Sequence, residues 1–350
     1  MFKLKYDDFL TYDESSGTYS MSAEQRVRDE TERNSWKTVG FTVLKDWRLY
    51  LMLVPMIVVY VLWRYMPMTE LLGAFKDYST FGNNGDTALM NWYGFNNFIE
   101  IFTGYNAQFF WPAFRNTFII AFYNLLFGFP APIILALFFN EVKSNVTRSV
   151  VQVLVYLPKF LSTVIVTSIA LLLVSGKSEF GDMGALSKLF AAIAPNNEAL
   201  QAALNGGLFN SAAYFRAMYV FTDLWEHAGY DSIVFFAAVI AVSPTSYEAA
   251  QMDGAGKMAQ MRYVVIPSIL STVVIMLIMK IGGLLSVGYE KVYLLLSTGN
   301  ESASQIVATL ANSWNDGKGI AAEMTNNLIG MILVIGSNIV ARKAANVSLY

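Results

Sequence analysis

Six long apolar runs constrain the fold of this chain more than any other feature. They cover about residues 49–65, 113–139, 150–174, 214–242, 266–287 and 321–340. A helix needs about 20 predominantly apolar residues to cross the hydrocarbon core of a bilayer, and the runs approach or exceed that length. Only 14% of the 350 residues are charged, whereas a soluble domain usually carries about 25%. The sequence therefore predicts an all-α polytopic membrane protein with six transmembrane helices.

The composition also excludes several kinds of functional site. Cysteine is absent, which excludes disulfides, thiolate catalysis and Cys-ligated zinc. The single histidine, His227, excludes a His-rich metal site. A net charge of −2 gives no indication of nucleic-acid binding. We therefore expect no metal and no cofactor in this chain.

The polar N-terminal stretch is expected to lie outside the membrane. Residues 1–46 are polar and charged, and the stretch 21–37 could form a charged helix without a clear apolar stripe. A solvated tail is favoured over a dedicated binding arm. The predicted organisation is a cytoplasmic tail (1–46), a transmembrane domain (47–345) and a short C-terminal tail (346–350).

The distribution of basic residues predicts the orientation. Lysine and arginine favour the cytoplasmic ends of membrane spans. With the N-terminus inside, the inner segments carry Lys37, Lys45, Arg48, Lys143, Arg148, Lys257, Arg262, Arg342 and Lys343. Both termini are then cytoplasmic, and three long loops lie outside.

The stretch 243–267 joins the fourth and fifth runs and has the pattern of a helix-turn-helix. Pro244 suits a first helical turn, and Thr245 with Glu248 fits a capping box. Asp253 and Gly254 are expected to break this helix, because glycine readily adopts positive φ. A second helix is expected over 256–265, and Pro267 should end it or begin the next span. An amphipathic helix on the membrane surface is the alternative, but it would not need the turn.

The fourth run carries ionisable residues that a membrane span tolerates poorly. Asp223, Glu226 and His227 are spaced by three and four residues, which places them on one helix face. Three interpretations stay open: a substrate pathway, a structural contact between helices, and a proton relay or metal site. Lys159 and Lys280 are possible countercharges. The remaining candidate pathway residues are the aromatic Tyr156, Phe160, Trp225, Tyr230 and Tyr289 and the acidic Asp231.

Two Gly-Lys pairs do not form a nucleotide site. Gly176-Lys177-Ser178 has Leu171 where a P-loop needs its first glycine, and Gly256-Lys257 is followed by Met258. We therefore expect that this chain does not hydrolyse ATP.

Several segments resemble a known transporter family. Glu248-Ala249-Ala250, Asp253-Gly254-Ala255 and the later Val264, Ile266 and Pro267 resemble the EAA loop in membrane subunits of binding-protein-dependent ABC importers. The segments FKDYSTF (75–81), WYGFNNFIEIF (92–102), 114–142, 151–166 and 278–295 are similar to LplB-type oligosaccharide permeases, which are related to the maltose-transporter membrane subunits. The resemblance covers roughly residues 45–345.

The resemblance implies a type I ABC importer permease in a bacterial cytoplasmic membrane. In that family six helices form half of the translocation pathway, and a second, related permease supplies the other half. Two ATPase subunits bind ATP and magnesium, and an extracytoplasmic sugar-binding protein delivers the carbohydrate. The implied ATPase-coupling residues are Glu248, Ala249, Ala250, Asp253, Gly254 and Pro267. The alternatives are a permease for another solute class and a stand-alone secondary carrier driven by protons through the acidic residues.

Overall fold

The computed structural model describes residues 11–13, 18–20, 47–78, 91–177, 182–314 and 316–345. Its contacts divide the chain into two units, residues 1–70 and 71–350. The predicted boundaries at residues 46 and 345 remain predictions. The charged stretch 21–37 lies outside the described residues, so its expected structure cannot be compared.

The first unit contains a short strand pair and the start of a long helix. Strand β1 (Thr11–Asp13) pairs antiparallel with β2 (Thr18–Ser20), and Tyr12 lies opposite Tyr19. Helix α3 (Trp47–Tyr60) continues as the π-helix η2 (Val61–Tyr65) and the 3-10 helix η3 (Met66–Phe75), which crosses the unit boundary. Apart from this strand pair, the described residues confirm the all-α class.

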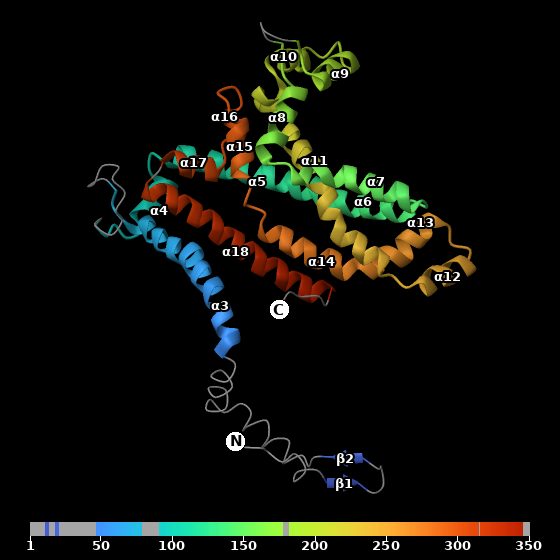
Figure 1. Ribbon diagram of the computed structural model, residues 1–350. Helices are drawn as coiled ribbons and strands as arrows, with labels where there is room; N and C mark the ends of the chain where they lie inside the picture. Colours follow the sequence, from blue (N-terminus) through green and yellow to red (C-terminus); the bar gives the residue numbers. More distant parts are fainter. Residues whose placement is uncertain are drawn as a thin grey trace. The chain divides into compact units, whose positions relative to one another are not determined.

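The second unit is helical throughout its described part (Figure 1). Its α-helices are α4 (Asn96–Thr103), α5 (Ala107–Gly128), α6 (Pro130–Glu141), α7 (Asn145–Tyr156), α8 (Thr163–Leu173), α9 (Ala185–Ile193), α10 (Glu198–Gly206), α11 (Ala212–Ile240), α12 (Pro244–Met252), α13 (Lys257–Gln260), α14 (Ile266–Gly282), α15 (Tyr289–Leu295), α16 (Glu301–Ser304), α17 (Val307–Trp314) and α18 (Gly317–Ala345). Short 3-10 turns η5 (Leu157–Phe160) and η6 (Leu208–Asn210) and the π-helix η7 (Met261–Val265) connect some of them.

The number of spans among the described helices equals the six predicted runs only if each bent pair of helices is counted as one span. Four helical segments are long and apolar enough to cross a membrane: Trp47–Phe75, Ala107–Glu141, Lys257–Gly282 and Gly317–Lys343. Two further pairs qualify when each is taken as one bent span, Asn145–Phe160 with Thr163–Leu173 and Ala212–Ile240 with Pro244–Met252. The described residues thus give four to six spans.

The third predicted run is not a straight helix. It bends by 103° between η5 and α8. Pro158 lies in the 3-10 turn, Leu161 has extended backbone, and the Ser162 side chain accepts a hydrogen bond from Ile165 N–H as the cap of α8. Proline and a new N-cap end one helix and begin another, which explains the bend.

Three groups of buried apolar side chains hold the second unit together. One joins α11 to α5, α8, α10, η6 and α15, and includes Phe215 and Tyr219. Another joins α4 and α5 to α17 and α18, with Phe110 at its centre. The last, around Val239, Val265 and Ile269, lies where α11 approaches η7 and α14.

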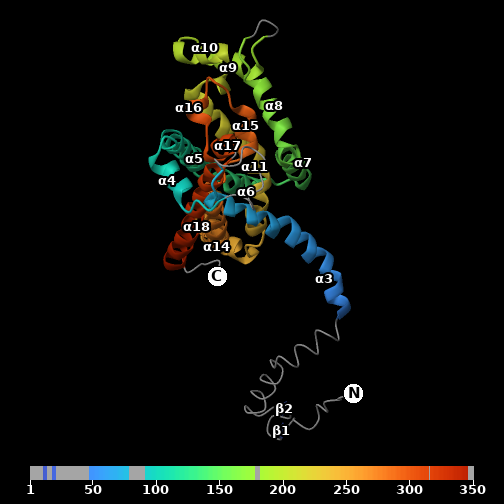
Figure 2. The ribbon, with the colours of Figure 1, turned by 90° about the vertical axis from the view of Figure 1, so that its left-hand side faces the viewer.

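The two ends of this unit present different structures. Helices α9 and α10 form a projection at one end, seen at the top of Figures 1 and 2. Helices α12 and α13 lie at a separate edge, on the right in Figure 1. A cavity in this unit is lined by residues of α5, α8, α11, α14 and α15.

Candidate functional site

The polar face of α11 is the centre of the candidate site. Asp223, Glu226 and His227 lie on one face, as their spacing predicts. The His227 ring Nδ1 is 3.6 Å from Asp223 Oδ1 and 3.9 Å from Glu226 Oε2. The same nitrogen is 3.1 Å from the Asp223 backbone oxygen, one helical turn earlier. Local helix geometry is therefore sufficient to gather these three groups.

A lysine from a distant helix lies between the two carboxylates. Lys291 of α15 donates a hydrogen bond to Asp223 Oδ1 at 2.8 Å, and its Nζ forms an ion pair with Glu226 Oε2 at 2.6 Å. Lys291 is 3% exposed and Glu226 4%. The ammonium also lies 5.6 Å from the centroid of the Tyr219 ring, a cation–π distance. Lys291 is not among the candidate residues predicted from the sequence.

These contacts bear on the metal interpretation. Asp223, Glu226 and His227 offer three possible ligand atoms within 4.8 Å of one another. The Lys291 ammonium, however, occupies the position between the two carboxylates that a cation would need. A buried ammonium supplies the same charge compensation as a bound cation, so the donor set does not fit a metal site while Lys291 is paired.

A cavity of about 440 Å³ adjoins this cluster. Among the predicted pathway residues, Lys159, Asp223, Glu226, His227, Lys280 and Tyr289 line it. Other lining residues include Asn124, Thr163, Ser286, Glu290 and Lys291. The cavity therefore combines hydroxyl, amide, carboxylate, ammonium and aromatic groups on five helices.

The remaining predicted pathway residues lie outside the lining. Tyr156 packs edge-on against Phe139, with ring centroids 6.1 Å apart. Phe160 and Tyr230 pack against each other, also edge-on at 6.1 Å. The Trp225 side chain is exposed on the surface of this chain. Asp231 pairs with Lys280 at 3.4 Å and so reaches the cavity only through that lysine.

The two predicted countercharges have different surroundings. Lys280 forms an ion pair with Asp231, as expected for a countercharge to the acidic residues of α11. Lys159 lines the cavity, but within the described part of the chain it forms no ion pair. The countercharge for Asp223 and Glu226 is Lys291 instead. The one local sequence feature that could have pointed to Lys291 is its place in Tyr289-Glu290-Lys291, directly after a glycine-containing helix break.

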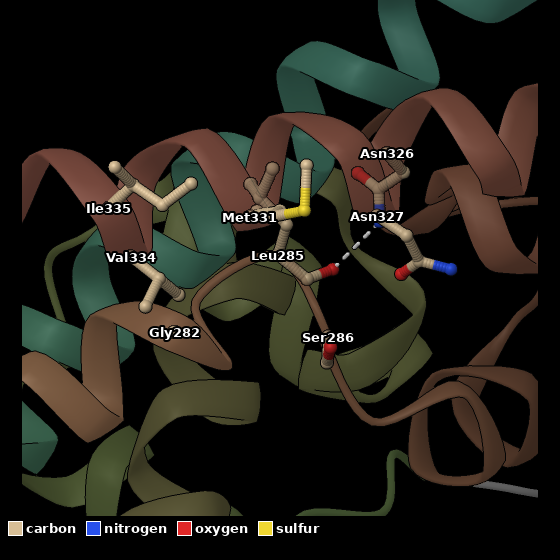
Figure 3. Close-up of a pocket in the computed structure, with 9 residues that line it drawn as sticks. Gly282, Leu285, Ser286, Asn326, Asn327, Met331, Val334 and Ile335 are labelled. Carbon is tan, nitrogen blue, oxygen red and sulfur yellow. Dashed lines mark hydrogen bonds between the residues drawn. The ribbon is translucent and has the colours of Figure 1, made fainter. Parts of the chain in front are cut away.

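The break between α14 and α15 contradicts the predicted length of the fifth span. The helix ends at Gly282, and residues 283–288 form turns and irregular chain, although the apolar run extends to residue 287. Adjacent glycines at 282 and 283 favour this ending. Asn326 of α18 donates a hydrogen bond from Nδ2 to Leu285 O at 3.1 Å (Figure 3).

A second cavity lies on the other side of the break. It measures about 450 Å³ and is lined by Gly282, Leu285, Ser286, Asn326, Asn327, Gly330, Met331, Val334 and Ile335 (Figure 3). Ser286 and the two asparagines form its polar end, and Met331, Val334 and Ile335 form its apolar end. Ser286 lines both cavities, so only the break separates them.

The predicted helix-turn-helix is present at 244–260. Helix α12 ends at Met252, and Gly254 has φ +75°. Gly254 N–H donates to Gln251 O at 3.0 Å and Ala255 N–H donates to Ala250 O at 2.9 Å. These two bonds form a Schellman motif, which requires positive φ at the glycine.

Most of this turn is exposed. Glu248, Ala249, Asp253 and Gly254 are exposed, and Ala250 is half-buried. Met252 and Met258 flank the turn with exposures of 88% and 75%. Flexible methionines at an exposed turn are typical of surfaces that bind a partner.

The loop is attached to the rest of the unit on one side. Lys257 pairs with Glu141 at the end of α6, at 3.3 Å. Gln260 Nε2 donates to Ala255 O at 2.7 Å and closes the turn from within.

One local prediction about this stretch was wrong and another is confirmed. The N-cap of α12 is Ser243 rather than Thr245, because Pro244 already begins the helix; the Ser243 and Thr245 hydroxyls lie 2.7 Å apart. Pro267 lies in the first turn of α14, which confirms that it marks the foot of the next helix, although Lys257–Gly282 is one continuous helical segment. The π-helix η7 immediately before Pro267 accommodates the hydrogen bond that proline cannot donate.

Comparisons with known proteins agree with these features. Residues 128–340 match the family described as binding-protein-dependent transport system inner membrane component. The chain is 34% identical to Protein LplB of Bacillus subtilis (strain 168) over 330 residues, which cover 92% of this chain and 98% of that protein. It is 35% identical to the polygalacturonan/rhamnogalacturonan transport system permease protein YteP of the same organism over 308 residues, covering 86% and 90%.

Solved structures show the same fold. One is a bacterial ABC transporter involved in the import of the acidic polysaccharide alginate, with a TM-score of 0.74, 29% identity, and coverage of 88% of this chain and 99% of that chain. Another is a bacterial alginate ABC transporter in complex with alginate pentasaccharide-bound periplasmic protein, with a TM-score of 0.75, 29% identity, and coverage of 90% and 99%. This chain therefore belongs to the family of inner-membrane components of binding-protein-dependent transport systems and has the fold of a type I ABC importer permease.

Proposed function

We propose that this chain is one permease subunit of an ATP-driven importer for an oligosaccharide. The observation that carries the proposal is near-complete coverage of relatives that transport saccharides. The similarity spans 99% of an alginate transporter chain and 90% of the permease YteP. Such coverage includes the cavity and the exposed turn together, so the proposal does not depend on a single motif.

The cavity supplies the chemistry that saccharide recognition needs. Sugar hydroxyls donate to carboxylates and accept from ammonium and amide groups, and aromatic rings pack on pyranose faces. Lys159, Asn124 and Tyr289 bring an ammonium, an amide and an aromatic ring to the lining. A second, related permease would complete the pathway, and an extracytoplasmic binding protein would deliver the sugar.

The exposed turn of α12 and α13 is proposed to bind an ATPase subunit in the cytoplasm. Glu248, Ala249, Ala250, Asp253 and Gly254 would form the contact, with Pro267 at the entry to the membrane. Partner subunits would bind ATP and magnesium, and this chain would be non-catalytic. The expected orientation places both termini on the cytoplasmic side.

A secondary carrier is the alternative from another class, and the ion cluster weighs against it. A proton relay needs carboxylates that gain and lose protons during transport. Asp223 and Glu226 instead share the buried ammonium of Lys291, an ion-pair partner that leaves neither carboxylate free to accept a transported proton. The full-length similarity likewise favours a saccharide over an amino acid or a phosphate.

Reconstituted vesicles test the proposal. We expect uptake of an oligosaccharide to require the binding protein, the second permease, the ATPase subunits and ATP. The ATP has to be present in the solution that faces the cytoplasmic side of the transporter. Dissipating the proton gradient should leave the uptake rate unchanged. Uptake that follows a proton gradient in vesicles containing this chain without ATPases would refute the proposal.

A further inference from the structure

Backbone hydrogen bonds support the irregular segment 283–288 only in part. Within and before it, Gly283 N–H donates to Met279 O at 3.3 Å, Leu284 N–H to Ile281 O at 3.1 Å and Ser286 N–H to Gly283 O at 3.0 Å. Non-helical chain at membrane depth persists only where protein or water satisfies its polar groups. This segment also separates the two cavities, so its position determines the shape of both.

Side chains from two other helices hold the segment on opposite sides. Asn326 of α18 donates to the Leu285 carbonyl from the side of the second cavity. On the side of the first cavity, Lys291 holds the beginning of α15 against α11 through Asp223 and Glu226. Tyr289, which lines the cavity, lies only two residues before Lys291.

The Lys291 contacts have the properties of a fixed attachment. Both Lys291 and Glu226 are buried, so neither charge can be compensated by water in place of its partner. Removing one member of a buried pair is strongly destabilising because the other charge remains uncompensated. By contrast, the Lys280–Asp231 pair is partly exposed and is screened more readily.

We infer that Lys291 is the positioning residue of the sugar cavity: by binding Asp223 and Glu226 it fixes segment 283–288 and the side chain of Tyr289 where substrate is bound. The sugar itself contacts other lining groups. This inference rests on the proposed function for the identity of the substrate. The position of the segment can nevertheless be measured without any substrate.

This chain has no natural cysteine, so a single introduced thiol can be followed in the full transporter when labelling is read on this subunit after its separation from the partners. Ser286→Cys introduces a single thiol in the exposed part of the segment, and its labelling rate by a maleimide reports how firmly the segment is held. With Lys291→Met added, we expect a faster labelling rate. Uptake should show a half-saturating sugar concentration raised about tenfold or more, a change that tenfold weaker binding would produce. Uptake is expressed per complex that copurifies with the second permease, so that reduced assembly of the variant does not count as weaker sugar binding.

Two further variants separate positioning from mere charge balance. Lys291→Met combined with Glu226→Met removes the more deeply buried of the two carboxylates that Lys291 compensates and leaves only the partly exposed Asp223. We expect this protein to fold and the raised half-saturating concentration to persist. A third protein exchanges the charges, Lys291→Glu with Glu226→Lys. It should restore, at least in part, both the slower labelling rate and the lower half-saturating sugar concentration of the parent protein. Lys188→Met, which breaks the exposed pair with Asp182, is the control and should change neither.

Three results would overturn the inference: an unchanged labelling rate in Lys291→Met, recovery of sugar affinity in the Lys291→Met/Glu226→Met protein, or loss of uptake only in proportion to lost assembly. If the parent complex transports no oligosaccharide while Lys291→Met still accelerates labelling, the proposed function fails but the role of Lys291 in holding the segment stands.

Discussion

Replacing Gly254 by proline is expected to abolish ATP-driven uptake while the permease remains inserted in the membrane. Gly254 has φ +75°, whereas proline is restricted to φ near −65°. Proline also removes the N–H that donates to Gln251 O. The Schellman motif is lost, and α12 can no longer turn into α13 at this point. We would measure uptake, and copurification of the ATPase subunits, in the same membranes.

The same loop contains its own control. Gly256 has φ −70°, and a methyl group there would meet no atom within 4 Å, so Gly256→Ala should retain normal transport. Gly254→Ala meets no neighbouring atom either, yet it places alanine in the left-handed region at a cost of about 1–2 kcal/mol. We expect it to have an intermediate effect. Normal uptake by Gly254→Pro would contradict the docking role of the turn.

Alanine at Gly229 is expected to destabilise the folded permease, although alanine normally stabilises a helix. Gly229 of α11 lies against the Val155 backbone of α7, and a methyl group would overlap the Val155 carbonyl. Backbone atoms cannot rotate away as a side chain can, so α11 and α7 must separate. Overpacking of this kind costs roughly 1–3 kcal/mol. Thermal unfolding of the detergent-solubilised protein would measure the loss.

Gly128→Ala provides the matched comparison. Gly128 ends α5, and a methyl group there meets nothing within 4 Å. Alanine is favoured over glycine in a helix by up to about 1 kcal/mol, so this variant should unfold at the same temperature as the parent or slightly higher. Equal stability of the two variants would show that α11 and α7 are not in close backbone contact.

Local sequence signals predicted the parts of the structure that local geometry determines. Gly254 could be recognised because a positive-φ turn depends on one residue type. The polar face of α11 followed from the spacing of Asp223, Glu226 and His227. The predicted capping box is absent because α12 begins at Pro244, so Thr245 lies inside the helix and Ser243 is the N-cap.

Other features depend on residues far apart in the chain, which no periodicity reveals. Lys291 and Glu226 meet only because α15 packs beside α8 and α11 in the folded protein. Apolar runs also do not distinguish a straight helix from a bent one. The run 150–174 is predominantly apolar, yet it bends by 103° at Pro158 and the cap at Ser162. Hydropathy predicted the presence of these elements but not their directions.

The buried ion cluster has a consequence for the order in which this protein is made. Ribosomes synthesise α11 before α15, and Lys291 follows Glu226 by about 65 residues, an interval of roughly 3–13 s at 5–20 residues per second. During that time two carboxylates lack their cation, and an acidic side chain at the centre of a span costs about 2.5–3.5 kcal/mol on insertion scales. Helix α11 also qualifies as a span only together with α12. We therefore expect stable integration of α11 to follow translation of α15, and nascent chains that stop before residue 289 should leave α11 accessible from outside the bilayer.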